Sequence, residues 1–152
     1  MALLAYALTT LADTKTYLGI SVSTHDTLLE NIINGATDFI EGQIGDRRIA
    51  STTYTNEEYD AKDEVIFLKQ WPITALTTVE RNDGTLETPS WTTLTDGADY
   101  EGYLNEGYVD FMVEISGRHR YRFTYTAGYT TIPSDLQMSV WMMVSAAFTK
   151  RK

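Results

Sequence analysis

The clearest periodic pattern in the chain lies between residues 25 and 44. Its apolar positions recur every three or four residues, as on one face of an α-helix: Leu28, Leu29, Ile32, Ile33, Ala36, Phe39, Ile40 and Ile44. Gly45 follows the last of them and is the expected stop. The pattern predicts a helix from His25 to Ile44, which would be about 30 Å long.

A shorter helix is predicted before it, from Leu11 to Leu18. Thr10 and Asp13 have the spacing at which two side chains cap a helix start, and Gly19 suits the helix end.

The third predicted helix spans residues 134–149. Pro133 and Ser134 begin it, and Ser134 is expected to cap the free N–H groups of the first turn. One stripe of apolar residues suits the core: Leu136, Val140, Met143, Val144 and Ala147. A second apolar set extends around the helix: Met138, Trp141, Met142 and Ala146. A helix that is apolar on most sides is usually buried on most sides, so we expect the second set to meet another subunit.

Between the helices, β-branched and aromatic residues alternate with turn residues, which is typical of short antiparallel strands. The predicted strands are Ile49–Thr55, Glu64–Lys69, Leu76–Arg81, Val109–Ile115 and His119–Thr126. A tight hairpin turn is predicted at residues 82–84, and an exposed acidic loop with at most one short strand at residues 96–108.

These elements predict an α+β fold, in which a small helical bundle carries an inserted antiparallel β-rich region. Residues 1–47 would be helical, residues 48–126 would form the insert, and residues 134–149 would return to the bundle. A chain of 152 residues fits one domain.

The charge of the chain narrows the choice of partners. A formal net charge of -9 opposes attraction to phosphate backbones, although DNA could still pass nearby without being bound. The sequence has no cysteine, so disulfides and thiolate metal sites are excluded. The apolar start lacks a basic leading segment and is too short for a membrane span, which favours a soluble intracellular product.

No arrangement of residues selects a catalytic or cofactor site. His25 and His119 lie in no recognisable ligand or triad spacing. The carboxylates of residues 57–64 fail the spacing of a calcium loop and favour an exposed acidic hairpin. Six tyrosines fall in the last third, where they could stack on sugars or bases or face a protein neighbour: Tyr100, Tyr103, Tyr108, Tyr121, Tyr125 and Tyr129.

Four segments, in their order and spacing, resemble a known family. They are LTTLADTKTYLGI at residues 8–20, LLENIINGATDFIEGQIGDR at residues 28–47, FLKQWPITALTTVERNDG at residues 67–84, and YTAGYTTIPSDL at residues 125–136. Together they cover most of the chain and resemble the head-to-tail connector, or head completion, proteins of long-tailed bacteriophages.

The resemblance implies a structural virion protein that catalyses no reaction and needs no cofactor or metal. It implies a ring of about twelve copies in the neck of the virion, seated beneath the portal protein, assembled in the host cytoplasm and without contact to a membrane. Such a ring extends the DNA channel, without binding DNA specifically, and offers a surface to the tail or to a stopper protein. The acidic balance suits a channel through which DNA slides.

The subunit or portal interface is expected at the end of the last helix. Its candidate residues are Met138, Trp141, Met142 and Ala146 together with the basic end Lys150, Arg151 and Lys152. The basic residues could instead only complement the helix dipole and keep the end soluble, which is the more frequent role of such a run.

Two alternatives stay open. One is another ring-forming neck or tail protein, such as a stopper or terminator. The other is a glycan-binding or glycan-cleaving β-domain that uses the tyrosine-rich loops.

Overall fold

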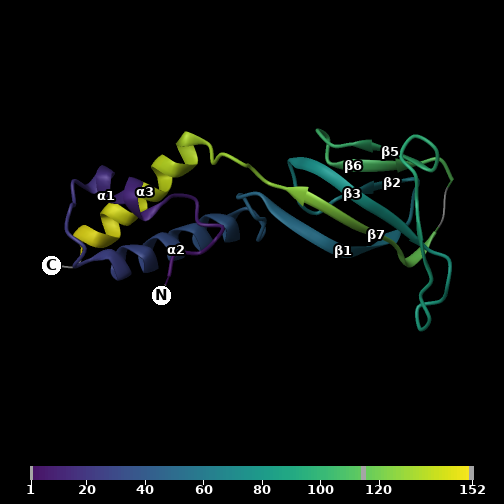
Figure 1. Ribbon diagram of the computed structural model, residues 1–152, viewed down its shortest axis with the longest axis horizontal. Coiled ribbons are helices and arrows are strands. Elements are labelled where there is room, and N and C mark those ends of the chain that lie inside the picture. Colours follow the sequence, from purple (N-terminus) through teal and green to yellow (C-terminus); the bar gives the residue numbers. More distant parts are fainter. Residues whose placement is uncertain (1, 114–115, 151–152) are drawn as a thin grey trace. The chain divides into compact units, whose positions relative to one another are not determined.

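A computed structural model describes residues 2–113 and 116–150 of the chain. The chain forms two compact units, one made of Met1–Ala50 with Tyr129–Lys152 and the other of Ser51–Gly128. Figure 1 shows the first as a helical unit and the second as a β unit. The β unit is an insertion between the second and third helices, as the sequence predicts. That both units form a single domain stays a prediction.

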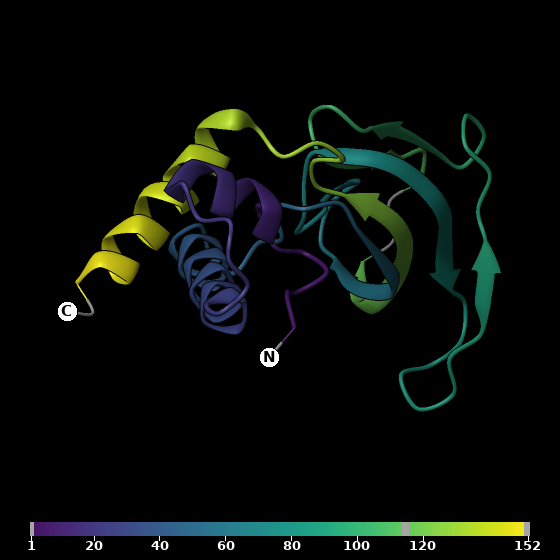
Figure 2. The same cartoon turned by 60° about the vertical axis from the view of Figure 1, so that its left-hand side comes forward.

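The helical unit contains three helices packed side by side (Figure 2): α1 (Leu11–Leu18), α2 (Asp26–Gln43) and α3 (Ser134–Thr149). The predicted capping pair is confirmed at α1, where the Asp13 amide donates to Thr10 Oγ1 at 3.0 Å and the Thr10 hydroxyl donates to the Asp13 carboxylate at 2.6 Å. Gly19 ends α1 in the left-handed region, with φ of 67°.

The start of α3 differs from the prediction. Ser134 was expected to be the cap, but it is already the first helical residue, and Pro133 takes the cap position without a side-chain hydrogen bond. A proline with its fixed φ can begin a helix at this point without losing a needed donor. The expected cap is therefore wrong, while the expected extent of the helix is confirmed.

The core of the helical unit is formed where α2 and α3 meet the N-terminal segment. Leu8, Leu29, Ile33, Val140 and Val144 have no exposed surface. Burial of such side chains stabilises the unit by about 1.5–3 kcal/mol each, before the entropy cost of ordering them.

Three buried polar side chains of α2 fix the segments that cross it. Asn34 Oδ1 accepts from the backbone amide of residue 4, and Thr37 Oγ1 accepts from that of Leu8. Glu41 accepts from the Ile49 amide at 2.9 Å and pairs with Arg48. The 49–55 strand prediction is thus wrong at its start, because Ile49 is buried in the helical core and the strand begins at Thr52.

The β unit holds two antiparallel sheets. The four-stranded sheet has the order β1 (Thr52–Ala61), β7 (Gly117–Ala127), β3 (Ile73–Asn82) and β4 (Trp91–Thr93). The three-stranded sheet has the order β2 (Val65–Phe67), β6 (Tyr108–Phe111) and β5 (Tyr100–Tyr103). These strands and helices confirm an α+β fold.

Aromatic side chains form the core between the two sheets. Phe111 of the three-stranded sheet stacks on Tyr121 of the four-stranded sheet with ring centroids 4.0 Å apart. Phe123 and Tyr125 follow on the same face of β7 and are fully buried. Alternation along β7 therefore directs every second side chain into this core.

Two loop predictions are wrong. The segment 96–108 is not a loop with one short strand at most, because it contains β5 and the start of β6, which pair as a hairpin with Tyr103 opposite Tyr108. Residues 82–84 are not a tight hairpin turn, because β3 and β4 are joined by a longer loop. Asn82 organises that loop: its side-chain oxygen accepts from the amides of Gly84 and Ser90 at 2.9 and 3.0 Å.

Candidate interaction surfaces

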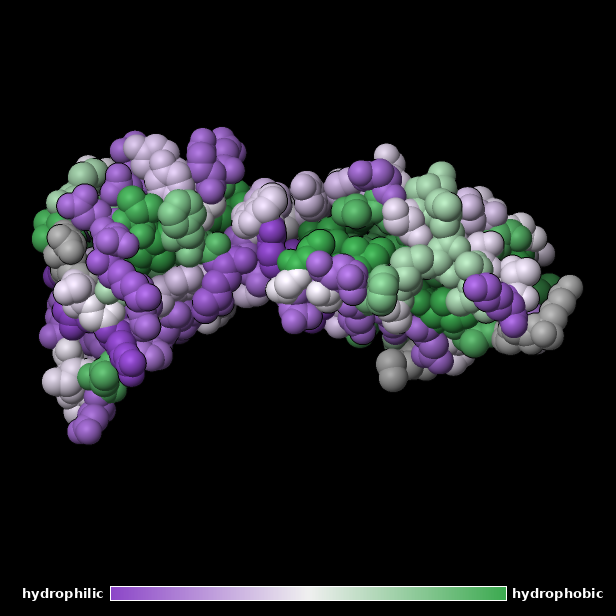
Figure 3. Space-filling view, turned by 180° about the vertical axis from the view of Figure 1, so that it is seen from behind, coloured by the Kyte–Doolittle hydropathy of each residue, from purple (hydrophilic) through white to green (hydrophobic). Residues whose placement is uncertain are grey.

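The outer face of α3 carries three of the predicted interface residues. Met138 and Met142 are 44% and 60% exposed, and Ala146 is exposed as well. They are spaced four residues apart and so share one face of the helix, while Val140 and Val144 on another face are buried. Figure 3 shows hydrophobic residues, in green, at the surface of the helical unit.

Trp141 lies differently from these three. Its ring stacks on Tyr17 of α1 with centroids 5.4 Å apart, and its indole Nε1 donates to Thr9 Oγ1 at 2.7 Å. Trp141 therefore joins α3 to α1 inside the helical unit. Only the part of its surface that is still exposed could contact another subunit.

A shallow apolar groove lies between α2 and α3, on the flank of the exposed α3 face. It has a volume of about 340 Å³. Its lining contains no charged side chain: Ile32, Gly35, Ala36, Phe39, Met143 and Ala147. Phe39 is 57% exposed at this groove. Sequence reasoning assigned Phe39 and Ile32 to the core stripe and did not predict a groove.

The basic end is described only in part. Lys150 is exposed and follows the last turn of α3, where a cation complements the helix dipole. Arg151 and Lys152 lie outside the described residues.

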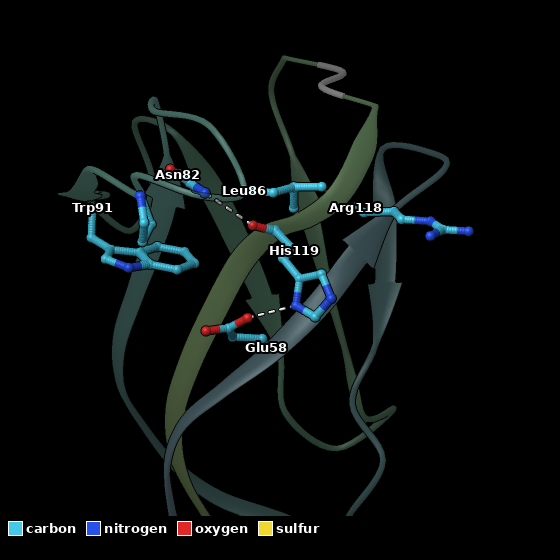
Figure 4. A pocket seen from close by; sticks show the side chains of 7 residues that line it. Glu58, Asn82, Leu86, Trp91, Arg118 and His119 are labelled. Carbon is cyan, nitrogen blue, oxygen red and sulfur yellow. Dashed lines mark hydrogen bonds and ion pairs between the residues drawn. The ribbon is translucent and has the colours of Figure 1, made fainter.

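A mixed pocket of about 350 Å³ lies in the β unit (Figure 4). His119 is held there in the left-handed region with φ of 48°; its amide donates to Asp60 and its Nδ1 lies 2.6 Å from Glu58 Oε2. Leu86 and Trp91 add apolar surface. The residues that line the pocket bring one imidazole, one carboxylate and one guanidinium, and the imidazole and the carboxylate are already hydrogen-bonded to each other.

The predicted acidic hairpin is partly directed into the protein. Glu57 accepts hydrogen bonds from the phenols of Tyr59 and Tyr125 at 2.6 and 2.7 Å and pairs with Lys69 at 3.2 Å. Burial by itself would raise the pKa of Glu57, but the hydrogen bonds from Tyr125, Tyr59 and Lys69 outweigh it and lower the pKa. Among the described residues, no group of three or more acidic or histidine side chains is placed to hold a metal ion.

The six tyrosines separate into core and surface. Tyr100, Tyr121 and Tyr125 are buried in the β unit, whereas Tyr129 is 40% exposed in the helical unit. Tyr103 and Tyr108 lie on the outer face of the three-stranded sheet.

Phe67 completes an aromatic row on that face, across three neighbouring strands. Phe67 pairs with Tyr108, and Tyr108 pairs with Tyr103. Their ring centroids are 5.4 and 4.7 Å apart. Phe67 is 68% exposed, which the sequence did not indicate because a lone Phe in a predicted strand is usually assigned to the core. We call Phe67, Tyr108 and Tyr103 the aromatic row.

Comparison with known proteins decides the family. The model of the head completion protein family matches residues 7–151, which is nearly the whole chain. The chain belongs to this family. No curated protein matches it. The family resemblance expected from the four sequence segments is thereby confirmed.

Two solved structures share the fold of this head completion protein. One is a chain in the neck of an empty gene transfer agent particle, computed with C6 symmetry, with 14% sequence identity and a TM-score of 0.62. The other belongs to the virion of a native gene transfer agent particle, with 16% identity and a TM-score of 0.65. Each match covers 100% of this chain and 83% of the other. No described helix is long and apolar enough to cross a membrane.

Proposed function

We propose that this family member is a structural neck protein that forms a ring beneath the portal, extends the DNA channel and presents the attachment surface for the tail or a stopper protein. The family match over residues 7–151 carries the proposal. The shared fold with a chain from a gene transfer agent neck agrees with it. The protein acts by assembly and catalyses no reaction.

The exposed face of α3 and the groove beside it are the proposed subunit contact. Met138, Met142 and Ala146 form an exposed apolar face, whose contact with water is unfavourable, and the uncharged groove lies along its flank. A ring needs a heterologous contact in which one patch meets a different patch of the next copy. The α3 face with its groove supplies one such patch, and in a closed ring it would meet a patch on another side of the next copy. About twelve copies are proposed for the ring, as the family resemblance implies.

The basic end of α3 is proposed to contribute at the edge of this contact or at the portal. Lys150, Arg151 and Lys152 form a short run of like charge on an acidic chain, so they suit an acidic patch on a neighbour. Assembly in the cytoplasm of the host and a final place in the virion neck belong to the same proposal.

Mixing the purified protein with its portal tests the function directly. Electron microscopy should show a ring seated on the portal, and size-exclusion chromatography with light scattering should show the complex. A protein that never meets the portal but binds elsewhere in the neck or tail would overturn the portal-proximal placement in favour of a stopper or terminator.

A further inference from the structure

The outer face of the three-stranded sheet combines partly exposed aromatic rings with two carboxylates. Phe67, Tyr108 and Tyr103 form the aromatic row. Two positions along the strands, on the same face, the next row contains Asp110 and Glu101. In the described part of the chain, neither carboxylate forms an ion pair with a lysine or arginine.

The opposite face of the same sheet belongs to the core of the β unit. Ile66, Val109 and Phe111 point into the core and are buried. The aromatic row lies on the other side of each strand. The core is therefore filled from the opposite face, while the three rings contact one another and Phe67 is 68% exposed.

Elsewhere the chain repeatedly combines an aromatic ring, a carboxylate and a cation. The Arg122 guanidinium lies 4.4 Å from the centroid of the Trp91 ring and makes two hydrogen bonds to Glu80. Arg48 lies over Tyr6 at 3.5 Å and pairs with Glu41.

A third example uses lysine: Lys69 lies 4.5 Å from the centroid of the Tyr59 ring and pairs with Glu57. In all three, the ring face and the carboxylate together hold one cation. The outer face of the three-stranded sheet supplies the ring and the carboxylate, and no described residue supplies the cation.

We propose that the aromatic row and its two carboxylates, Glu101 and Asp110, bind an arginine-bearing segment of a partner protein. A planar guanidinium stacks on tyrosine or phenylalanine and can bond a carboxylate with two N–H groups at once. Glu101 is already held near the row, since the Tyr103 phenol donates to it at 3.1 Å. An extended segment with arginines at alternate positions would place successive guanidinium groups along one side.

Charge favours this occupant over the two other ligands that aromatic platforms take. A nucleic acid would bring phosphates toward Glu101, Asp110 and the exposed Glu106, on a chain of net charge -9. A neutral glycan could stack on the rings and donate its hydroxyls to the carboxylates, but it would not neutralise their charge. A cationic segment gains from both features.

The inference deepens the proposed function, because the partner would be a neighbouring neck component. The identity of this partner rests on the proposed function. The two can fail separately. Ring formation on the portal depends on the helical unit in our proposal, whereas peptide binding is measured on the β unit of the full chain.

The test uses a fluorescent hexapeptide with three arginines at alternate positions and glycines between them, titrated with the full chain by fluorescence anisotropy. Replacing arginine by the neutral isostere citrulline should weaken binding by about fivefold or more, and the lysine peptide should fall between. Phe67→Ser, and Glu101→Gln combined with Asp110→Asn, should each weaken arginine-peptide binding by a similar factor.

Matched controls separate this surface from the general acidity of the chain. Leu86→Ser changes another exposed apolar residue, and Glu87→Gln combined with Asp135→Asn removes the same two charges from exposed positions elsewhere. Both should bind like the original chain, and thermal unfolding should show all variants folded. Equal binding of the citrulline peptide, equal loss in the controls, or displacement of the peptide by a soluble oligosaccharide would each overturn the proposal.

Discussion

The phenol of Tyr125 donates a 2.7 Å hydrogen bond to the carboxylate of Glu57, across two neighbouring strands. Tyr59 donates to the same carboxylate from β1, so two tyrosines from the two strands meet one charge. Tyr125 is fully buried and lies in the aromatic core. Because a buried phenol without a partner is costly, this contact fixes how β1 lies on β7.

Replacing Tyr125 with Phe should therefore destabilise the β unit while leaving its packing intact. The charged Glu57 carboxylate would lose the hydrogen bond from the phenol, and the loss of such a bond costs about 1.5–3 kcal/mol. The free energy of unfolding, measured with urea, should fall by that amount. Tyr129→Phe, at an exposed tyrosine of the helical unit, is the control and should change the stability little.

The same contact predicts a pH dependence of stability. Hydrogen bonds lower the pKa of Glu57 below its ordinary value of 4.5, so the folded state holds this proton less tightly than the unfolded state does. The stabilisation is thus fully present above about pH 4.5 and is lost as the pH falls through the lowered folded pKa. The free energy of unfolding is measured by urea titration at each pH from 7 to 3. Its decrease toward low pH should be smaller in Glu57→Gln and unchanged in Glu87→Gln, at an exposed position. An equally large decrease in Glu57→Gln would contradict the prediction.

What the sequence predicted well depends on local information. The cap of α1 depends on two residues three positions apart, Thr10 and Asp13, and the apolar period of α2 repeats every three or four residues. The structure confirms both helices. The hairpin of β5 and β6 was missed because Gly and Asn between tyrosines indicate a loop just as well. The pairing of β1 with β7 joins residues more than fifty positions apart, which no local pattern encodes.

At the candidate surfaces too, local sequence predicted some features, and contacts between distant residues decided the others. The helical period correctly separated Val140 and Val144 from Met138 and Met142 on α3, because angular spacing alone decides which face a residue shares. The contact of Trp141 with Tyr17 could not be predicted, since it depends on how α1 packs on α3. Exposure of Phe67 likewise depends on which face of its strand turns to the other sheet.

Substitutions on the two faces of α3 should have opposite effects on folding and assembly. Val140→Glu places a charge in a fully buried position and should unfold the helical unit, at a cost above about 3 kcal/mol. Met142→Glu, at a 60% exposed position, should leave the circular dichroism and the melting temperature almost unchanged but abolish ring formation on the portal. Chromatography with light scattering separates the two results. A Met142→Glu protein that still forms rings would exclude this face as the subunit contact.

Trp141 should contribute to folding more than to assembly. Trp141→Phe keeps an aromatic ring near Tyr17 but removes the indole donor to Thr9, a residue that is only 5% exposed. We expect a loss of about 1 kcal/mol in the free energy of unfolding, because one hydrogen bond is removed and a buried hydroxyl loses its partner. Ring formation should persist at temperatures where the variant is folded. Met138→Leu, which preserves an apolar side chain on the exposed face, is a suitable control for stability.

The loop between β3 and β4 should depend on one side chain and one glycine. Asn82→Ala removes the oxygen that accepts from Gly84 and Ser90, so the stability should drop by roughly 2 kcal/mol and these two amides should exchange with solvent faster. Gly84→Ala should disturb the same loop for a steric reason, since an added Cβ would lie 2.3 Å from the backbone oxygen of Thr88.

Gly97→Ala is not a fair comparison for these loop substitutions, because its φ of 75° adds backbone strain. The better control is Gly35→Ala on α2, where a Cβ meets nothing within 4 Å and helix propensity favours alanine. Hydrogen exchange of the loop amides that is equal in Asn82→Ala and in Gly35→Ala would show that Asn82 does not organise the loop.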